Sequence, residues 1–404
     1  MNTIDGLDIQ DTAPWSARAL FRMLARLESG RLVITTPEGI RRHFEGARTG
    51  PVADLVIHDW KAIAAMLRRA EIGIFECWRD GLVGTSNMTA FLELCAVNQA
   101  ALERVFYGNP VSALVLRLAH LMRPNTRAGS RKNIHAHYDL GNEFYGQWLD
   151  PGMTYSSALF GGETGMDLES AQQAKYERLL EVLQIDSTHH VLEIGCGWGA
   201  FAQRAAATRG CRVSGLTISN AQLEFARSRI ERAGLAHQVD LRFCDYRDAQ
   251  GQYDRIVSIE MVEAVGVRFW QAYFRTLRER LKPGGRAALQ SIVIAEGAFD
   301  RYRRTSDFIR EYVFPGGMLP SGSRFVAEAR AAGLQARTPF LFGADYAETL
   351  RRWRKAFDAN EPRIRALGFD DRFIAAWRFY LDYCEAGFNT GRVDVMQIEL
   401  ARPR

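Results

Sequence analysis

The middle of the chain alternates between short apolar runs and longer amphipathic stretches. Apolar runs bounded by glycine or polar turns are typical of buried strands, and apolar positions three or four residues apart are typical of helices. On this pattern we expect strands at residues 190–194, 212–217, 239–244, 255–260 and 286–294. Helices are expected at residues 168–183, 200–208 and 219–234. Strands that alternate with helices in this way predict an α/β fold, with a mostly parallel sheet and helices on both faces.

One of these helices has a specific start signal. Ser219 precedes the helical stretch, and its hydroxyl can accept a hydrogen bond from the backbone N–H of Gln222. The side chain of Gln222 is expected to reach back to Ser219, which would complete a capping box. Gly234 is a natural end for the same helix.

The chain before this pattern is organised differently. Residues 1–125 combine helical patterns with strand-like apolar runs, at residues 31–35, 53–57 and 72–75. We interpret them as a smaller α+β domain. Residues 123–133 are basic and contain Pro, Gly and Ser, which is typical of a linker or an exposed edge. The predicted boundary lies there, and residues 126–404 form the second domain.

The last part of the chain interrupts the alternation. Residues 295–345 contain aromatic and Gly/Pro-rich pieces, and we interpret them as an insertion that caps the ligand end of the sheet. Residues 346–388 are again mostly helical in pattern.

The composition is that of a globular protein, with 404 residues of which 47% are hydrophobic and 25% are charged. The net charge of +5 favours an anionic partner such as a phospholipid surface. It does not demand nucleic acid, and none is expected. No stretch approaches the roughly 20 apolar residues of a membrane-spanning helix, and no signal peptide is visible. We therefore expect a cytoplasmic protein that meets the inner face of the membrane only at its surface.

Metal and disulfide chemistry have little support. The six cysteines form no CxxC pair and no zinc spacing, which suggests reduced thiols in a cytosolic protein. His135 and His137 lie two residues apart, but no third ligand stands at a useful spacing. No metal site is expected.

The sharpest motif is the glycine-rich turn after the first predicted strand, Val191–Gly199. Gly195 and Gly197 follow a strand and precede a helix, so the backbone can approach a ligand closely. A dinucleotide-binding fingerprint also fits these glycines, but such a site requires an acid about 20 residues on, where this chain has Thr217. Glu193 stands two residues before the first glycine, where a carboxylate can meet the cationic methionine moiety of S-adenosylmethionine. The motif therefore favours the methyl donor over a dinucleotide.

Two residues after the third predicted strand complete this hypothesis. Asp245 is a candidate acceptor for the adenine ring, and Tyr246 is a candidate for stacking against it. Cys196, within the glycine motif, is interpreted as a small wall residue and not as a nucleophile.

Several further segments accompany the glycine motif. They are residues 137–142 (HYDLGN), 149–151 (LDP), 153–157 (MTYSS), 169–175 (ESAQQAK), 254–258 (DRIVS), 314–320 (FPGGMLP) and 342–346 (FGADY). Over about residues 130–400 the chain resembles the cyclopropane-fatty-acyl-phospholipid synthase family, which includes the mycolic acid cyclopropane synthases. The resemblance implies a class I S-adenosylmethionine-dependent methyltransferase with a Rossmann-like fold. The N-terminal domain resembles the auxiliary domain of full-length members, which implies lipid presentation or dimerisation and a possible homodimer.

The resemblance also implies site residues. Those that match contacts to the methyl donor are Tyr155, Ser156, Gly195, Gly197, Thr217 and Gln222. Glu263 matches the acidic residue of the active site, and Tyr346 matches its tyrosine. In the family these two help to hold a bicarbonate ion that acts as a base, together with a histidine side chain and two backbone amides.

The chain departs from this pattern at two positions. Ser157 stands where the best-known members carry Cys, and Gln290 stands where they carry the bicarbonate-binding histidine. The backbone N–H groups of Ser157 and Ile292 remain as donors. Gln290 can donate a hydrogen bond but cannot take up a proton as histidine does. Two forms of the base therefore stay open: Glu263 acting directly, or a bicarbonate ion oriented by Tyr346 and Gln290.

The chemistry implied by the family requires such a base. An alkene that attacks a sulfonium methyl group leaves a carbocation on the acyl chain, and closing a cyclopropane ring then removes a proton from the new methyl group. Aromatic side chains can stabilise the cation, and the site must exclude water. The aromatic candidates are Tyr155, Trp270, Tyr312 and Phe342.

The predicted function is therefore the conversion of an unsaturated phospholipid acyl chain to a cyclopropane acyl chain. If the proton leaves from another carbon, or after a hydride shift, the product is a methylene- or methyl-branched chain. N-methylation of a small molecule is a further alternative, because plant alkaloid N-methyltransferases share this fold and parts of these motifs. A lipid-binding protein with an inactive methyltransferase fold is the non-enzymatic alternative, and the intact donor motif argues against it.

Overall fold

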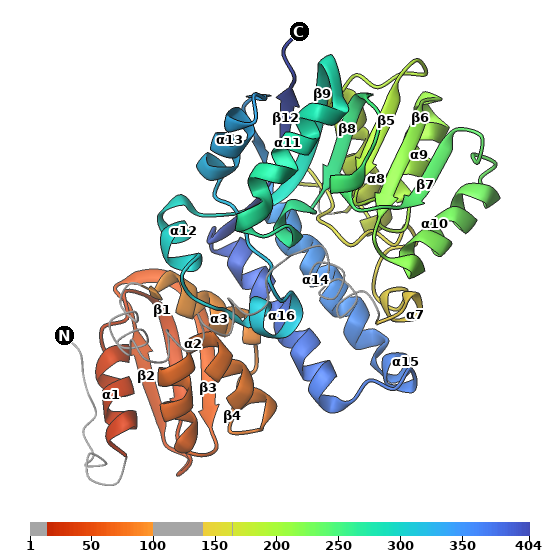
Figure 1. The fold of residues 1–404 in the computed structure, drawn as a ribbon. Helices are drawn as coiled ribbons and strands as arrows, with labels where there is room; N and C mark the ends of the chain where they lie inside the picture. Colours follow the sequence, from red (N-terminus) through yellow and green to blue (C-terminus); the bar gives the residue numbers. More distant parts are fainter. Residues whose placement is uncertain (1–13, 100–139, 164) are drawn as a thin grey trace. The chain divides into compact units, whose positions relative to one another are not determined.

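A computed structural model describes residues 14–99, 140–163 and 165–404 of the chain. They form two compact units (Figure 1). The first comprises Met1–Leu116 and Ala375–Ala386, and the second comprises Arg117–Ile374 and Gly387–Arg404, each in its described part. The boundary predicted near residue 125, the pair His135 and His137, and the start of the HYDLGN segment lie outside the described residues. The division into residues 1–125 and 126–404 stays a prediction.

The first unit contains a four-stranded sheet with the order β2-β1-β3-β4. Its strands are β1 (Ser29–Thr35), β2 (Arg41–Glu45), β3 (Arg48–Ile57) and β4 (Val83–Gly84). Its helices include α1 (Trp15–Leu24), α2 (Lys61–Arg79) and α3 (Met88–Val97). Strands β1 and β3 contain the first two apolar runs predicted for this region.

The third apolar run of this region was predicted wrongly. Residues 72–75 form part of helix α2, not a strand. Ile72, Ile74 and Phe75 are all buried, so the helix is apolar on several sides over this turn. A short run of buried residues has no period that separates a strand from a helix.

The second unit is built on a larger sheet with the order β10-β12-β9-β8-β5-β6-β7, in which β11 also pairs with β12. The strands are β5 (His190–Ile194), β6 (Arg212–Thr217), β7 (Val239–Phe243), β8 (Tyr253–Ile259), β9 (Leu281–Ile294), β10 (Gln335–Ala336), β11 (Phe340–Leu341) and β12 (Val393–Ala401). Strands β5 to β9 pair in parallel, and β10 and β11 pair antiparallel with β12, which is itself antiparallel to β9. The predicted α/β fold with a mostly parallel sheet is confirmed.

Helices cover both faces of this sheet. The helical elements of the second unit are α7 (Asn142–Tyr145), α8 (Leu168–Val182), α9 (Ala200–Arg209), α10 (Asn220–Arg232), η1 (Tyr246–Asp248), η2 (Val262–Ala264), η3 (Val267–Phe269), α11 (Trp270–Arg280), α12 (Glu296–Tyr302), η4 (Ile309–Val313), α13 (Gly322–Ala331), α14 (Gly343–Ala359) and α15 (Glu361–Ala366). Helix α16 (Asp371–Asn389) is shared between the two units.

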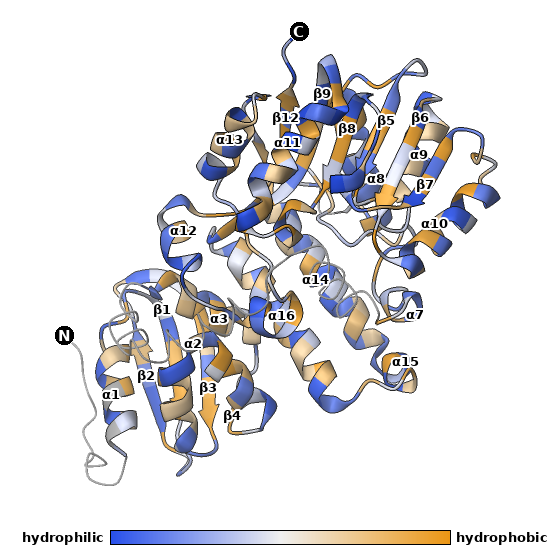
Figure 2. Ribbon diagram, viewed as in Figure 1, coloured by the Kyte–Doolittle hydropathy of each residue, from blue (hydrophilic) through white to orange (hydrophobic). Residues whose placement is uncertain are grey.

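Two apolar cores lie on the two faces of the sheet. Helices α8, α9 and α10 contribute side chains such as Leu179, Phe201 and Leu223 to one core. Helices α11 and α13 contribute side chains such as Phe274 and Phe325 to the other. Figure 2 shows that most of the strands are hydrophobic, whereas the outer surfaces of helices such as α10 are hydrophilic. The five predicted strands and three predicted helices of this region are therefore all present, with shifts of a few residues at their ends.

The predicted insertion has a mixed role. Near Phe314 and Met318 it approaches the carboxyl ends of the strands, and the Met318 N–H donates to the Glu263 carbonyl at 2.8 Å. Helix α13 instead covers a face of the sheet, because Phe325 and Ala329 belong to its apolar core. Strand β12, which the sequence pattern did not predict, follows and completes the sheet beside β9. In the described part of the chain, no helix is long and apolar enough to cross a bilayer.

Candidate active site

The glycine-rich turn lies between strand β5 and helix α9. Gly195, Gly197 and Gly199 have positive φ angles of 83°, 50° and 81°, which favour glycine. A β-carbon on Gly195 would come 3.0 Å from the Met261 side chain, whereas one on Gly197 would meet no atom within 4 Å. The turn therefore bends tightly against the protein on one side and leaves open space beside Gly197.

Glu193 places a buried carboxylate at this turn. Its side chain is only 3% exposed, and it lines the cavity in front of the glycines. Its Oε2 atom has no hydrogen-bond partner within the described residues. Burial raises the pKa of this carboxyl group well above its usual value. An orphaned carboxylate oxygen in a closed pocket fits a cationic ligand, so this residue fits the methionine moiety of S-adenosylmethionine.

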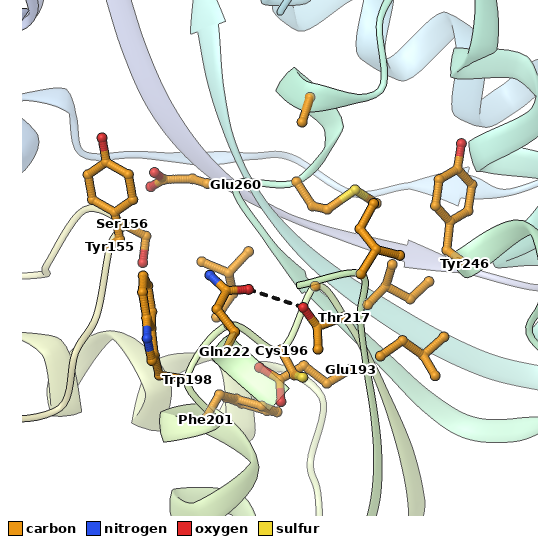
Figure 3. Close-up of a pocket in the computed structure, with 18 of the residues that line it drawn as sticks. Tyr155, Ser156, Glu193, Cys196, Trp198, Phe201, Thr217, Gln222, Tyr246 and Glu260 are labelled. Atoms are coloured by element: carbon orange, nitrogen blue, oxygen red, sulfur yellow. Dashed lines mark hydrogen bonds between the residues drawn. The ribbon is translucent and has the colours of Figure 1, made fainter. Parts of the chain in front are cut away.

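The same cavity collects every residue that the sequence assigned to the methyl donor (Figure 3). They are Tyr155, Ser156, Glu193, Gly195, Gly197, Thr217, Gln222, Asp245 and Tyr246. They come from strands β5 and β6, helix α10 and the loops at the carboxyl ends of the strands, where parallel sheets bind their ligands.

The capping box predicted at the start of α10 is only half formed. The Gln222 N–H donates to Ser219 Oγ at 3.3 Å, as predicted. The Gln222 side chain does not return to Ser219, because its Oε1 accepts a hydrogen bond from Thr217 Oγ1 at 3.1 Å. This bond fixes the Gln222 amide at the wall of the cavity, next to Thr217 (Figure 3).

Asp245, the predicted acceptor for the adenine ring, is more constrained than the sequence suggested. Its carboxylate accepts hydrogen bonds from Arg247 Nε at 2.8 Å and Nη2 at 2.6 Å. Tyr246 packs edge-on against Tyr273 and lines the cavity with its ring. Burial raises the pKa of Tyr246 to about 12, so it stays a neutral aromatic surface at physiological pH.

A second cluster of polar groups converges on Glu260, which follows strand β8. The Ser157 N–H donates to Glu260 Oε1 at 2.9 Å, and Gln290 Nε2 donates to the same oxygen at 2.8 Å. Tyr346 Oη donates to Glu260 Oε2 at 2.7 Å. Three residues assigned to catalysis therefore meet at one carboxylate, and Glu260 also lines the donor cavity (Figure 3).

The backbone at Glu260 is strained. Its φ angle is 50°, in the left-handed region that residues with a β-carbon rarely adopt. Such strain costs on the order of 1 kcal/mol or more and is concentrated at functional sites. The conformation turns the side chain toward its three donors.

Glu263, which the resemblance implied as the active-site acid, lies near Glu260 but does not line the donor cavity. Its Oε1 accepts a hydrogen bond from the Ile292 N–H at 2.5 Å. Burial, and next the negative charge of Glu260, raise its pKa to about 8. Glu263 therefore holds a proton at neutral pH and is poorly suited to act as a base.

These contacts decide whether the predicted bicarbonate ion has free hydrogen-bond donors in this site. Of the four donors that the sequence assigned to that ion, three bind the Glu260 carboxylate and the fourth, the Ile292 N–H, binds Glu263. A bicarbonate ion would have to displace a carboxylate that belongs to the chain itself. The residues present therefore do not fit this ion.

Lys175 supplies a positive charge near the cluster. It is completely buried, and its Nζ donates to Ser156 Oγ at 2.6 Å. Burial lowers its pKa to about 7, while the negative charges of Glu260, Asp150 and Glu193 oppose that shift. The reciprocal effect of Lys175 favours the ionised form of Glu260, whose pKa is raised chiefly by burial.

Aromatic rings surround the space beside Glu260. The centroid of the Tyr155 ring lies 5.5 Å from that of Trp353 and 6.5 Å from that of Phe314. Trp353 also meets Tyr346, with 6.1 Å between the ring centroids. Of the aromatic residues suggested by the sequence, Tyr155 lines the cavity, whereas Trp270 is buried in an apolar core.

Glu260 and Lys175 were not singled out from the sequence, although signals for both are present. Glu260 is an acid directly after a buried strand, at the edge where a parallel sheet places its functional groups. Lys175 stands four residues from Ala171 and from Leu179, both completely buried, and so lies on the apolar face of its helix. A lysine in that position needs a buried partner.

We predict that Glu193→Gln weakens the binding of S-adenosylmethionine by about 10- to 100-fold, the value of a hydrogen bond to a charged group. Isothermal titration calorimetry measures the effect. Glu177→Gln is the matched control, because Glu177 pairs with Arg204 outside the cavity. Equal affinities for the two variants would show that Glu193 does not contact the donor.

Comparisons with known proteins show the family of the chain. Residues 125–398 match the family described as mycolic acid cyclopropane synthetase. Tuberculostearic acid methyltransferase UfaA1 of Mycobacterium tuberculosis is 38% identical over 88% of this chain and 85% of its own length. Cyclopropane-fatty-acyl-phospholipid synthase of Escherichia coli is 33% identical over 87% of this chain and 88% of its own.

A solved structure extends the similarity to three dimensions. The mycolic acid cyclopropane synthase CmaA1, in complex with SAH and CTAB, matches 67% of this chain and 98% of its own. The TM-score is 0.63 and the sequence identity is 30%. With the donor cavity and its glycine turn, these matches show that the chain belongs to the mycolic acid cyclopropane synthetase family of S-adenosylmethionine-dependent methyltransferases.

Proposed function

We propose that this enzyme transfers the methyl group of S-adenosylmethionine to the double bond of an unsaturated fatty-acyl chain in a phospholipid, with Glu260 as the base. The observation that carries the proposal is the position of the Glu260 carboxylate, which lines the same cavity as the donor residues. A base that lines this cavity would be within reach of the methyl group of bound S-adenosylmethionine. N-methylation of an amine would need no such base.

The residues divide the chemistry between them. Bound S-adenosylmethionine supplies an electrophilic methyl group on a cationic sulfur atom. The π electrons of the alkene form the new carbon–carbon bond, the sulfur keeps the electrons of the broken bond, and a cation remains on the acyl chain. Tyr155 and its aromatic neighbours exclude water and stabilise this cation. Glu260 then accepts a proton.

The first product that we propose is a cyclopropane ring. It forms when Glu260 removes a proton from the new methyl group while the cation is still on the neighbouring carbon. The electrons of that C–H bond close the ring. The proximity of Glu260 to the donor cavity supports this route, as does the similarity to the E. coli cyclopropane synthase.

A methylene-branched chain is the second candidate, and the hydrogen bonds at Glu260 favour it. Three donors stabilise its charge and make it a weaker base than it would be without them, although burial raises its pKa overall. A weaker base leaves the cation more time to undergo a hydride shift. Loss of a proton from the methyl group then leaves a methylene branch and not a ring. The 38% identical relative carries the name of a methyltransferase, in agreement with this route.

The substrate class follows from the lipid chemistry named in these relatives. We propose that the enzyme reaches a phospholipid acyl chain at the surface of the membrane that contains it. The N-terminal unit is proposed to present the lipid or to support a dimer.

We predict that Glu260→Gln lowers kcat at least about a hundredfold, the usual contribution of a general base, without loss of donor binding. In Glu263→Gln, kcat is expected to fall less than about tenfold, because Glu263 is already mostly neutral at pH 7. The amide oxygen of the new glutamine can still accept a hydrogen bond from the Ile292 N–H. The activity of both variants is measured as the rate of S-adenosylhomocysteine release, with dioleoyl-phospholipid vesicles as the substrate. The opposite ranking would return the catalytic role to Glu263.

The product is identified by expressing the protein in a bacterium that lacks cyclopropane synthase and analysing its phospholipid fatty acids by mass spectrometry. We expect a gain of one CH₂ unit per modified chain. Loss of the alkene establishes the cyclopropane, and a retained alkene with a new branch establishes the methylene product. An unchanged fatty-acid profile, from a protein that binds S-adenosylmethionine, would contradict the proposed substrate.

A further inference from the structure

Hydrogen bonds connect Glu260, the proposed base, to buried polar side chains outside the donor cavity. Gln290 Nε2 donates to Glu260 Oε1 at 2.8 Å, and Gln290 Oε1 accepts a hydrogen bond from Gln397 Nε2 at 3.0 Å. The Gln397 Oε1 atom accepts a hydrogen bond from Arg178 Nη1 at 2.8 Å. A continuous chain of hydrogen bonds therefore runs from Arg178 through two amides to Glu260.

The sheet holds the middle of this chain in place. Gln290 on β9 and Gln397 on β12 are directly paired across two antiparallel strands, so their side chains stand on one face as neighbours. They are 1% and 3% exposed. Buried amides need partners for their oxygen and nitrogen atoms, and each of these two has both.

Arg178 fixes which atom of each glutamine amide donates and which accepts along this chain of hydrogen bonds. An amide can present either its oxygen or its nitrogen to a neighbour, but a guanidinium group can only donate. Arg178 therefore requires the oxygen of Gln397, and the nitrogen of Gln397 is left to face Gln290. The oxygen of Gln290 is then bound, and its N–H group must face Glu260.

Arg178 is itself held in a defined place. It lies one helical turn after Lys175 on α8, and its guanidinium carbon lies 4.0 Å from the centre of the Phe340 ring on β11. Burial lowers its pKa, and the charge of Glu181 opposes this shift, so the side chain stays cationic at physiological pH. From this position its Nη1 donates to Gln397.

We propose that Arg178 is a positioning residue that keeps Glu260 ionised, by fixing the orientation of the Gln397 and Gln290 amides. This inference rests on the proposed role of Glu260 as the base. Gln290 Nε2 also donates to the Ser157 carbonyl at 3.3 Å, and this bond opposes a turn of the Gln290 amide. Without Arg178, the Gln397 amide can turn and present its oxygen to the Gln290 oxygen. This repulsion favours a turned Gln290, whose oxygen would face the Glu260 carboxylate and destabilise its charge. The pKa of Glu260 would then rise, and the base would be lost at a higher pH.

Other charges also face Glu260, and they set the background for this effect. Lys175 on α8 favours its ionised form, and Tyr346 on α14 donates to it. Burial, and next the charge of Glu260, raise the pKa of Glu263 in η2 to about 8, so Glu263 is mostly neutral near pH 7 and adds little repulsion there. None of these groups forms part of the hydrogen-bond chain from Arg178.

The test is the pH profile of kcat/KM for Arg178→Met on vesicles of dioleoyl phosphatidylethanolamine and dioleoyl phosphatidylglycerol. The acid limb is expected to move upward by roughly half a pH unit to one unit, which lowers the rate about three- to tenfold on that limb. Gln397→Leu is expected to give the same shift, because it cuts the chain at its next member. Arg178→Lys, which keeps a charged donor, is expected to restore part of the shift.

Arg204→Met is the matched control, because Arg204 forms a comparable half-buried ion pair with Glu177 and has no contact with either glutamine. Its acid limb is expected to stay in place. A second readout needs no turnover: ¹³C NMR of protein labelled at the glutamate carboxyl carbons follows Glu260 directly, assigned by its absence in Glu260→Gln. If the pKa of Glu260 in Arg178→Met equals that in the unmodified enzyme, the inference is wrong. Full activity of Glu260→Gln would instead overturn the proposed function.

Discussion

The proposed mechanism depends on one requirement: a carboxylate must stay ionised in a cavity from which water is excluded. An isolated charge loses much of its solvation on burial and would normally take up a proton. Here the Glu260 carboxylate receives hydrogen bonds from a backbone N–H, an amide and a phenol, and it lies near the buried Lys175, whose charged form favours its ionisation. These groups replace the water that the reaction cannot tolerate, because water would trap the carbocation.

The topology of the sheet brings these groups together from distant parts of the chain. Glu260 follows β8, Gln290 lies on the adjacent β9, and Gln397 lies on β12 beside it. Ser157 and Tyr346 come from a loop and a helix that are 189 positions apart in sequence number (346 − 157). The backbone of Glu260 adopts a strained left-handed conformation, which directs its side chain to this point. The donor end of the cavity follows the more familiar arrangement, with a glycine turn after β5.

The sequence predicts the sheet well, and it predicts residues that meet at one cavity, because both predictions rest on local patterns. A strand followed by glycines and a helix is readable in Val191–Gly199, and every residue assigned to the donor lines one cavity. The sequence left two forms of the base open, Glu263 itself or a bicarbonate ion, because the family pattern was transferred by position. No local pattern shows that Glu260 occupies the donors of a bicarbonate ion, since those donors come from three distant segments. The pairing of Gln290 with Gln397 is equally hidden, because it depends on the register of an antiparallel strand that the pattern did not predict.

The central claim is that a side chain of this enzyme does the work that the family resemblance assigned to bicarbonate. The most direct measurement is the activity of Glu260→Gly with and without added bicarbonate, in buffers freed of carbon dioxide, beside the unmodified enzyme. Glycine tolerates the positive φ angle at this position and leaves the Ser157, Gln290 and Tyr346 donors open. We expect the unmodified enzyme to be indifferent to bicarbonate, and the variant to be inactive without the ion and partly restored by it. Loss of activity of the unmodified enzyme on removal of bicarbonate would contradict the account, as would a variant that binds S-adenosylmethionine normally and stays inactive at every bicarbonate concentration.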